Sequence, residues 1–104
     1  PEIASVGQTE QELRTAGVDY QVHRVPMSLS GRFVIENEQG NGFCKLLTDS
    51  EGVILGAHML GNGSSEILVP AIMAVQCGLK LSDLAKVVFP HPTVCEILRL
   101  AALH

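Results

Sequence analysis

The sequence predicts an α+β fold, in which an antiparallel sheet is packed with helices. Two apolar segments, residues 43–48 and 53–60, are the clearest strands, and Asp49-Ser50-Glu51-Gly52 joins them through a glycine that can adopt positive φ. They therefore predict a hairpin. The order of elements is strand, helix, strand, then the hairpin, then helices, which favours an antiparallel sheet with helices on one face. A length of 104 residues predicts one domain, residues 1–104.

The first third of the chain contributes two further strands and a helix. Residues 3–6 predict a short strand, and residues 20–25 alternate in the manner of a second one. Between them, Thr9-Glu10-Gln11-Glu12 has the form of a capping box and predicts a helix that Gly17 ends. Residues 26–31 are interpreted as a loop, and residues 32–35 are ambiguous. Residues 37–42 are polar and predict a turn.

Three helices are predicted after the hairpin. The first covers residues 66–77 and either begins near Glu66 or bends at Pro70, because proline is accommodated only in the first turn of a helix. A short helix follows at residues 82–86, and the last covers residues 93–103. The first and last are apolar on most sides, which leaves two alternatives open: burial in the core of this domain, or a subunit interface.

Composition and charge exclude several functions. Apolar residues make up 46% and charged residues only 17%, which predicts some apolar surface for a partner. The net charge of −4, without a Lys/Arg cluster, argues against nucleic-acid binding. No apolar run reaches membrane-spanning length. Cys44, Cys77 and Cys95 are odd in number and widely spaced, which predicts reduced, buried thiols in a cytoplasmic setting rather than a disulfide framework. A chain that starts at Pro1 is expected to be a piece of a longer protein.

The candidate site lies in the stretch from Phe89 to Glu96. Pro90 and Pro92 flank His91 and favour extended backbone there. Thr93-Val94-Cys95-Glu96 has the T-x-x-E form of a capping box and predicts a helix that begins at Thr93. An imidazole at a helix start, with a carboxylate one turn away, suits a base whose orientation and tautomer a partner fixes. The alternative is a loop histidine beside a capping glutamate, and one carboxylate can fill both roles.

Other candidate sites are weaker. Gly61-x-Gly63 lies between a strand and a helix, but Glu66 breaks the G-x-G-x-x-G pattern and disfavours nucleotide binding. His91 and Cys95 have a spacing that suits a metal, yet no second ligand cluster completes a site, so no metal is predicted. A Cys95–His91 nucleophile pair is the remaining alternative, although the apolar neighbours of Cys95 favour a buried structural thiol. His23 and His58 fall within strands and are interpreted as structural.

Four stretches together resemble a known family. The motif His91-Pro92-Thr93-x-x-Glu96 is similar to the H-P-T-x-x-E motif near the C-terminus of the pyridine nucleotide–disulfide oxidoreductases. The resemblance covers essentially the whole chain and implies their C-terminal dimerisation domain. The other matching stretches are Pro1-Glu2-Ile3-Ala4-Ser5-Val6-Gly7-x-Thr9-Glu10, Gly42-Phe43-Cys44-Lys45-Leu46 and Gly56-Ala57-His58-Met59-Leu60-Gly61.

Within the family the sequence most resembles the dihydrolipoyl (lipoamide) dehydrogenases. Residues 26–32 and 84–91 carry this narrower resemblance. Phe89-Pro90 stands where the lipoamide enzymes usually have His-Ala, so a sibling disulfide reductase, of the glutathione or mercuric type, stays an alternative. Glutathione reductases commonly carry a second acid where this chain has Ile97, and mercuric reductases end in a cysteine pair that is absent from these 104 residues.

The resemblance implies a homodimeric flavoenzyme in which FAD, NAD and a redox-active C-x-x-x-x-C lie outside this chain. It implies that His91 reaches the partner subunit's active site and takes a proton from a dithiol, while Glu96 hydrogen-bonds the imidazole and stabilises its protonated form. It also implies that backbone at His91 and Pro92 touches the partner's FAD, and that the bond between these residues is cis.

Three expectations follow from this assignment. The fragment alone should bind no cofactor and be inactive. Its last two long helices should form the dimer contact, and lipoyl domains of 2-oxo acid dehydrogenase complexes should be partners of the full-length enzyme. A different class of function, a free-standing assembly module in which His91 does no chemistry, remains the alternative.

Overall fold

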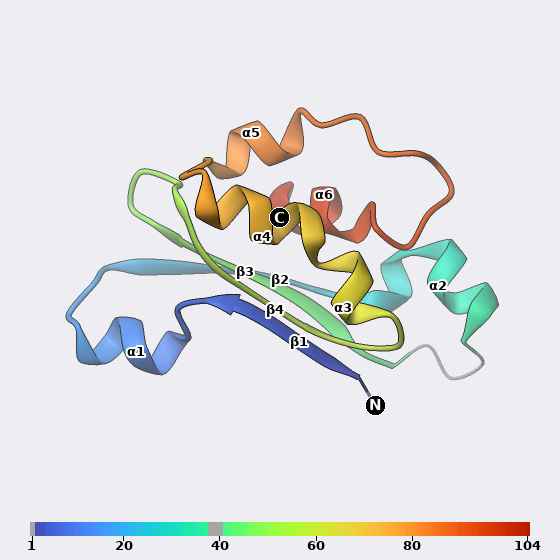
Figure 1. Cartoon of the computed structure of the whole chain (residues 1–104), viewed down its shortest axis with the longest axis horizontal. Coiled ribbons are helices and arrows are strands. Elements are labelled where there is room, and N and C mark those ends of the chain that lie inside the picture. Colours follow the sequence, from blue (N-terminus) through green and yellow to red (C-terminus); the bar gives the residue numbers. More distant parts are fainter. Residues whose placement is uncertain (1, 38–40) are drawn as a thin grey trace.

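An antiparallel sheet with strand order β1-β4-β3-β2 forms the centre of the molecule (Figure 1). The structure is a computed structural model, and it describes residues 2–37 and 41–104. Every pairing in the sheet is antiparallel, and β3 and β4 form the predicted hairpin, with Gly52 at positive φ in its turn. The strands are β1 (Ile3–Gly7), β2 (Tyr20–Pro26), β3 (Phe43–Asp49) and β4 (Ile54–Leu60).

Helices cover one face of this sheet, as the sequence predicts. α4 contacts β1 and β4, α6 contacts β2 and β3, and α5 packs on α6 (Figure 1). The α+β fold class is therefore confirmed. The helical elements are α1 (Glu10–Thr15), the 3₁₀ turn η1 (Met27–Leu29), α2 (Gly31–Glu36), α3 (Ser64–Ile67), α4 (Val69–Gln76), α5 (Leu81–Ala85) and α6 (Ile97–Ala102).

The helix α1 departs from this one-sided arrangement. Side chains alternate along β3, so Leu47 points away from the face that Leu46 presents to α6. Leu47 and Leu13 of α1 are both fully buried, and Lys45 on the same side of β3 pairs with Glu10 of α1 at 2.8 Å. The helix α1 therefore shields part of the opposite sheet face. Its capping box at Thr9 forms as predicted.

One predicted loop is wrong, and one segment that the sequence left ambiguous is helical. Residues 26–31 contain η1, and the ambiguous segment 32–35 belongs to α2. The helix forms because the Ser30 side chain accepts a hydrogen bond from the amide of Phe33 and caps its start. A serine cap without an acid three residues later is a weak sequence signal. The predicted turn at 37–42 lies largely outside the described residues, because 38–40 are not described.

The two long predicted helices are both shorter than expected. Residues 66–77 form α3 and α4, with a junction at Leu68, because Pro70 lacks an amide donor and its ring would clash with the carbonyl of Glu66 in a continuous helix. The helix predicted at 93–103 begins only at Ile97. The helix does not start at Thr93 as predicted, because residues 93–96 form a turn in which the Thr93 hydroxyl donates to Pro90 O at 2.7 Å.

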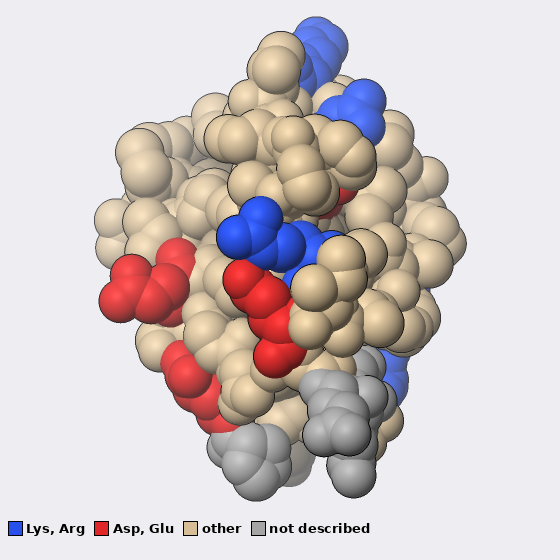
Figure 2. All heavy atoms as spheres, turned by 90° about the vertical axis from the view of Figure 1, so that its right-hand side faces the viewer, with Lys and Arg blue, Asp and Glu red and all other residues tan. Residues whose placement is uncertain are grey.

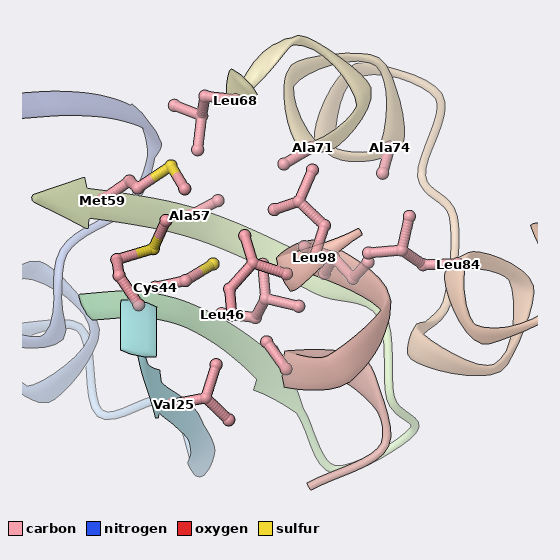
Figure 3. Close-up of a cluster of buried hydrophobic side chains, with 14 of the residues drawn as sticks. Val25, Cys44, Leu46, Ala57, Met59, Leu68, Ala71, Ala74, Leu84 and Leu98 are labelled. Atoms are coloured by element: carbon pink, nitrogen blue, oxygen red, sulfur yellow. The ribbon is translucent and has the colours of Figure 1, made fainter. Parts of the chain in front are cut away.

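The core lies between the sheet and the helices α4, α5 and α6. In Figure 3, Leu98 of α6 lies among Leu46 of β3, Leu84 of α5 and the alanines of α4. The small side chains of Ala71 and Ala74 allow α4 to approach the layer below closely, and both are fully buried. Of the two alternatives for the last helix, the buried face of α6 thus belongs to the core of this domain.

Two glycines are required by close backbone approaches. A Cβ on Gly42 would lie 2.1 Å from Leu60 O, and the φ of Gly42 is +139°, which side-chain-bearing residues rarely adopt. A Cβ on Gly56 would lie 2.2 Å from Gln8 O. Each glycine thus lets neighbouring backbone close in at an end of the sheet.

We expect Leu98→Ala to lower the free energy of unfolding by about 2–5 kcal/mol, because it leaves a cavity in the core. Leu103→Ala is the matched control, since Leu103 is 56% exposed at the end of the same helix; its cost should stay within about 0.5 kcal/mol. Urea unfolding of both variants measures the difference. Equal costs would contradict this description of the core.

Candidate active site

His91 and Glu96 form a direct pair in the turn before α6. His91 Nδ1 lies 2.8 Å from Glu96 Oε1 and 3.0 Å from Glu96 Oε2, and the His91–Pro92 peptide bond is cis. The imidazole is 80% exposed, whereas the carboxylate side chain is only 20% exposed. The turn therefore exposes the imidazole to solvent, while the carboxylate that binds it is sheltered. The two residues that the sequence predicts as a pair are in direct contact.

The carboxylate determines the tautomer of a neutral imidazole. An ionised carboxylate can only accept hydrogen bonds, so His91 Nδ1 must carry a proton to satisfy the contact. The lone pair of a neutral ring then lies on Nε2, on the exposed imidazole. This arrangement produces a base at Nε2, with the positive charge that protonation creates placed beside a carboxylate.

Glu96 is held by the turn itself. Its Oε2 accepts from the amide of Thr93 at 3.1 Å, so it supplies one half of the predicted capping box while it also binds His91. The hydrogen bond from His91, and then those from Thr93, lower the pKa of Glu96 against the opposing effect of desolvation. The capping and functional interpretations of Glu96 are thus compatible in this geometry.

A cleft of about 420 Å³ opens beside the pair, between residues 85–89 and α6. His91 and Glu96 line it, together with Arg99, whose Nε donates to Ala85 O at 3.1 Å and holds the two sides together. Figure 2 views the end of the molecule where α2 and the segment before His91 lie; residues other than Lys, Arg, Asp and Glu cover most of it, and basic and acidic side chains adjoin near its centre.

The sequence did not predict the contacts that hold the turn from outside. Ser30 Oγ donates to Thr93 O and Arg32 Nη1 donates to Pro92 O, each at 3.4 Å. Their acceptors are backbone carbonyls some 60 positions away in the sequence, so no local pattern marks them. The only signal was that both residues lie in the 26–32 stretch that carries the narrower resemblance.

Two of the three thiols, those of Cys44 and Cys95, are sheltered and poorly nucleophilic, whereas Cys77 is exposed, so the prediction that the thiols are buried is wrong for Cys77. Burial raises the pKa of Cys95, and its Sγ lies 3.7 Å from Ile67 O rather than in the first turn of a helix. Burial raises the pKa of Cys44 to about 12. Because the thiolate is the reactive form, both side chains are poor nucleophiles, and the structural interpretation of Cys95 is favoured.

The remaining candidates also have structural explanations. His23 Nε2 lies 3.1 Å from Thr48 Oγ1, and His58 bridges neighbouring backbone and side chains near β1. Within residues 2–37 and 41–104, no three His, Cys, Asp or Glu side chains gather as a metal site requires. Among the helices of these residues, none is both long and apolar enough to cross a membrane.

The Gly61-x-Gly63 loop is occupied by a side chain of the protein. Glu2 Oε1 accepts from the amide of Gly63 at 3.0 Å, and Glu2 Oε2 accepts from the amide of Ser65 at 2.9 Å. The Ser65 hydroxyl also contacts this carboxylate, and these bonds lower the pKa of Glu2. The amides that a phosphate would need are thus used to tie β1 to α3.

A family model described as the pyridine nucleotide-disulphide oxidoreductase, dimerisation domain, matches residues 1–102. The chain belongs to this family. Dihydrolipoyl dehydrogenase 3 of Pseudomonas aeruginosa is 42% identical over 104 residues, which are 99% of this chain and 22% of that protein. The mitochondrial dihydrolipoyl dehydrogenase of Caenorhabditis elegans is 36% identical over 104 residues, which are 99% of this chain and 21% of that protein. The chain thus spans about a fifth of the length of these relatives.

Solved structures agree with this assignment. The HOCl-induced flavoprotein disulfide reductase RclA of Escherichia coli, as its Cu(II) complex, superposes with a TM-score of 0.91 at 30% identity, covering 99% of this chain and 23% of that one. LpdA of Mycobacterium tuberculosis superposes with a TM-score of 0.89 at 27% identity, covering 99% and 22%. The family resemblance, including the similarity to dihydrolipoyl dehydrogenases, is therefore confirmed.

Alkylation tests the assignment of the thiols. We expect iodoacetamide at pH 8 to modify Cys77 first in the native protein, because Cys77 is exposed while burial raises the pKa of Cys44 and Cys95. Mass spectrometry of peptides taken over time measures the order. Modification of Cys95 as fast as Cys77 would show that its thiol is accessible and reactive.

A side-chain NMR titration tests the His91–Glu96 contact. We expect His91→Ala to raise the pKa of Glu96 toward its ordinary value, because the largest cause of its lowering is lost. The native pKa lies below that of the unfolded chain, so the contribution of Glu96 to stability is present above the unfolded-state pKa and is lost as the pH falls through the native one. The pKa of Glu10, lowered mainly by Lys45, should not move. A pKa of Glu96 that does not change in His91→Ala would contradict the hydrogen bond between the two side chains.

Proposed function

We propose that this chain is the interface domain of a dihydrolipoyl dehydrogenase, and that His91 is the base that acts on the dithiol substrate in the partner subunit's active site. The single observation that carries the proposal is the exposed imidazole whose Nδ1 bonds the sheltered carboxylate of Glu96 at 2.8 Å. Similarity to dihydrolipoyl dehydrogenases along 99% of the chain supports the substrate class.

The proposed proton transfer uses the free nitrogen of the ring. Nε2 takes the proton of one substrate thiol, and the resulting thiolate attacks the redox disulfide of the partner subunit, forming a mixed disulfide and releasing one protein thiolate. The second substrate thiol then closes the substrate disulfide, the mixed disulfide bond breaks, and the proton of this thiol passes to the protein sulfur that is released. Glu96 stabilises the imidazolium that the first step creates. Only a thiolate attacks efficiently, so the base governs the rate.

The proposal places the cofactors outside these 104 residues. The residues of the turn fit a contact with an FAD held by the partner subunit, because His91 and Pro92 are both exposed and their backbone can be reached from another chain. When bound, the FAD would accept the electrons of the dithiol and pass them to NAD. What this chain supplies is the ring, its carboxylate and the backbone of the turn. The fragment alone should therefore be inactive.

Exposed apolar side chains support a homodimer. Val69 and Met73 on α4 are 46% and 60% exposed, and Leu103 at the end of α6 is 56% exposed. Val88, in the segment before His91, is 94% exposed. A second copy that covers these side chains would bring His91 to the partner's active site. Lipoyl domains of a 2-oxo acid dehydrogenase complex would then deliver the dithiol, in a compartment that keeps thiols reduced, such as the cytoplasm.

A sibling disulfide reductase is the second candidate. The superposition on RclA, a flavoprotein disulfide reductase, has a TM-score of 0.91, so the fold also suits that class. Phe89 lines the cleft beside His91 and makes its wall more apolar than a histidine would. A panel of dihydrolipoamide, glutathione disulfide and other disulfides, tested on the full-length enzyme, separates the two candidates.

Replacement of His91 tests the proposed role. We expect His91→Gln in the full-length enzyme to lower the rate of NAD reduction by dihydrolipoamide by about 10²–10⁴-fold, because a general base is lost. His58→Gln is the matched control, since His58 lies in β4, away from the turn. Steady-state kinetics at equal flavin content measures both. A His91→Gln enzyme as active as the control would remove His91 as the base and leave the family assignment standing.

A further inference from the structure

The turn that carries His91 is tied to the start of α2. Ser30 Oγ donates to Thr93 O at 3.4 Å, and Arg32 Nη1 donates to Pro92 O at 3.4 Å. These carbonyls belong to the two residues that directly follow His91. The helix α2 therefore holds the backbone of the turn from outside, whereas Glu96 holds its imidazole from within.

Ser30 is buried and has both of its hydrogen-bonding roles filled. It is 1% exposed, and its hydroxyl accepts from the amide of Phe33 at 3.2 Å. A hydroxyl carries a single proton, so the contact with Thr93 O uses the only hydrogen that Ser30 can donate. Buried polar groups are rarely left unpaired, so this hydroxyl couples the position of the turn to the start of α2.

Arg32 is oriented by a second contact on its own helix. Its Nε donates to Glu36 Oε2 at 2.9 Å, one helical turn further along α2. Because the guanidinium is planar and rigid, fixing Nε also directs Nη1, which is the atom that reaches Pro92 O. Glu36 thus orients the arginine but lies outside the contacts that reach the turn directly.

The backbone of this turn governs where the imidazole lies. The His91 ring is 80% exposed, so packing does little to place it, and Glu96 fixes one nitrogen only. A displacement of about 1 Å in a reacting group can cost about 10²-fold in rate. We propose that Ser30 and Arg32 are positioning residues that hold His91 in register with the dithiol through the carbonyls of Thr93 and Pro92. This inference rests on the proposed function.

The test uses the full-length holoenzyme. We expect Ser30→Ala to lower the turnover of dihydrolipoamide by about tenfold. Arg32→Met should lower it by about threefold, because its long contact comes from an exposed side chain. NADH oxidation by ferricyanide, which needs the flavin but no dithiol, should be unchanged in both. The pH profile of dithiol turnover should shift, because the imidazole no longer sits against Glu96 in the same way.

Two controls test whether the loss of turnover comes only from a loss of helix capping or of a surface ion pair. Thr9→Ala also deletes a helix-capping hydroxyl, in α1 and far from the turn, so it matches the loss of a cap in Ser30→Ala. Glu36→Gln removes the charge of the ion partner but keeps an oxygen that can accept from Arg32 Nε, so Arg32 stays directed at Pro92 O. Both controls should keep the turnover of the parent enzyme. Should Ser30→Ala fail to fold, Arg32→Met carries the test alone, because Arg32 is at the surface.

A double-mutant cycle with His91→Gln decides whether Ser30 acts through the histidine. Ser30→Ala should have no further effect in the His91→Gln enzyme, because there is no longer a base to position. The same loss in both backgrounds, or an equal loss in Thr9→Ala, would overturn the inference. A large effect of His91→Gln with none from Ser30→Ala and Arg32→Met would overturn this inference alone. If His91→Gln leaves the turnover of dihydrolipoamide unchanged, both the proposed function and this inference are wrong.

Discussion

The hydrogen bond between His91 Nδ1 and Glu96 is the interaction on which the rest of the site depends. It assigns the proton of a neutral ring to Nδ1 and leaves Nε2 as the basic nitrogen. It also places negative charge beside the position where protonation would create positive charge. Neither residue has this property alone, because an exposed histidine without the carboxylate would be free to turn and to change tautomer.

The architecture explains why this pair can lie at the surface and still be ordered. The buried face of α6 is anchored by Ile97, Leu98 and Ala101 against the sheet, which fixes the end of the turn at Glu96. At the other end, Arg99 holds the carbonyl of Ala85 across the cleft. The turn thus spans two anchored points, and its imidazole projects outward. In the proposed dimer, a second subunit would meet that projecting ring.

Much of the fold follows from local patterns in the sequence. Alternation and the Gly52 turn predict the β3–β4 hairpin, and the reciprocal contacts of Thr9 and Glu12 make the start of α1 recognisable. The same T-x-x-E pattern misleads at Thr93, where the hydroxyl donates to the carbonyl of Pro90 and the helix begins only at Ile97. The helix α2 was left ambiguous because Ser30 caps it without an acid three residues later, which is a weak local signal.

The sequence likewise predicts some residues of the candidate site and not others. His91 and Glu96 could be paired from their spacing, since five residues around a proline turn bring their side chains together. Ser30, Arg32 and Arg99 could not be assigned, because each binds a backbone carbonyl and carbonyls leave no mark in a sequence. The occupation of the Gly61-x-Gly63 amides by Glu2 was equally hidden, as it joins opposite ends of a 60-residue segment.

Mixed dimers would show whether His91 serves the active site of the other subunit. One subunit would carry His91→Gln, and the other would lack the redox cysteines that the proposal places outside these residues. Each homodimer should be inactive with dihydrolipoamide. We expect the purified mixed dimer to regain about half of the activity of the unaltered enzyme, because one of its two symmetric sites combines an intact disulfide with an intact histidine. A mixed dimer as inactive as either homodimer would show that His91 does not act in the active site of the other subunit.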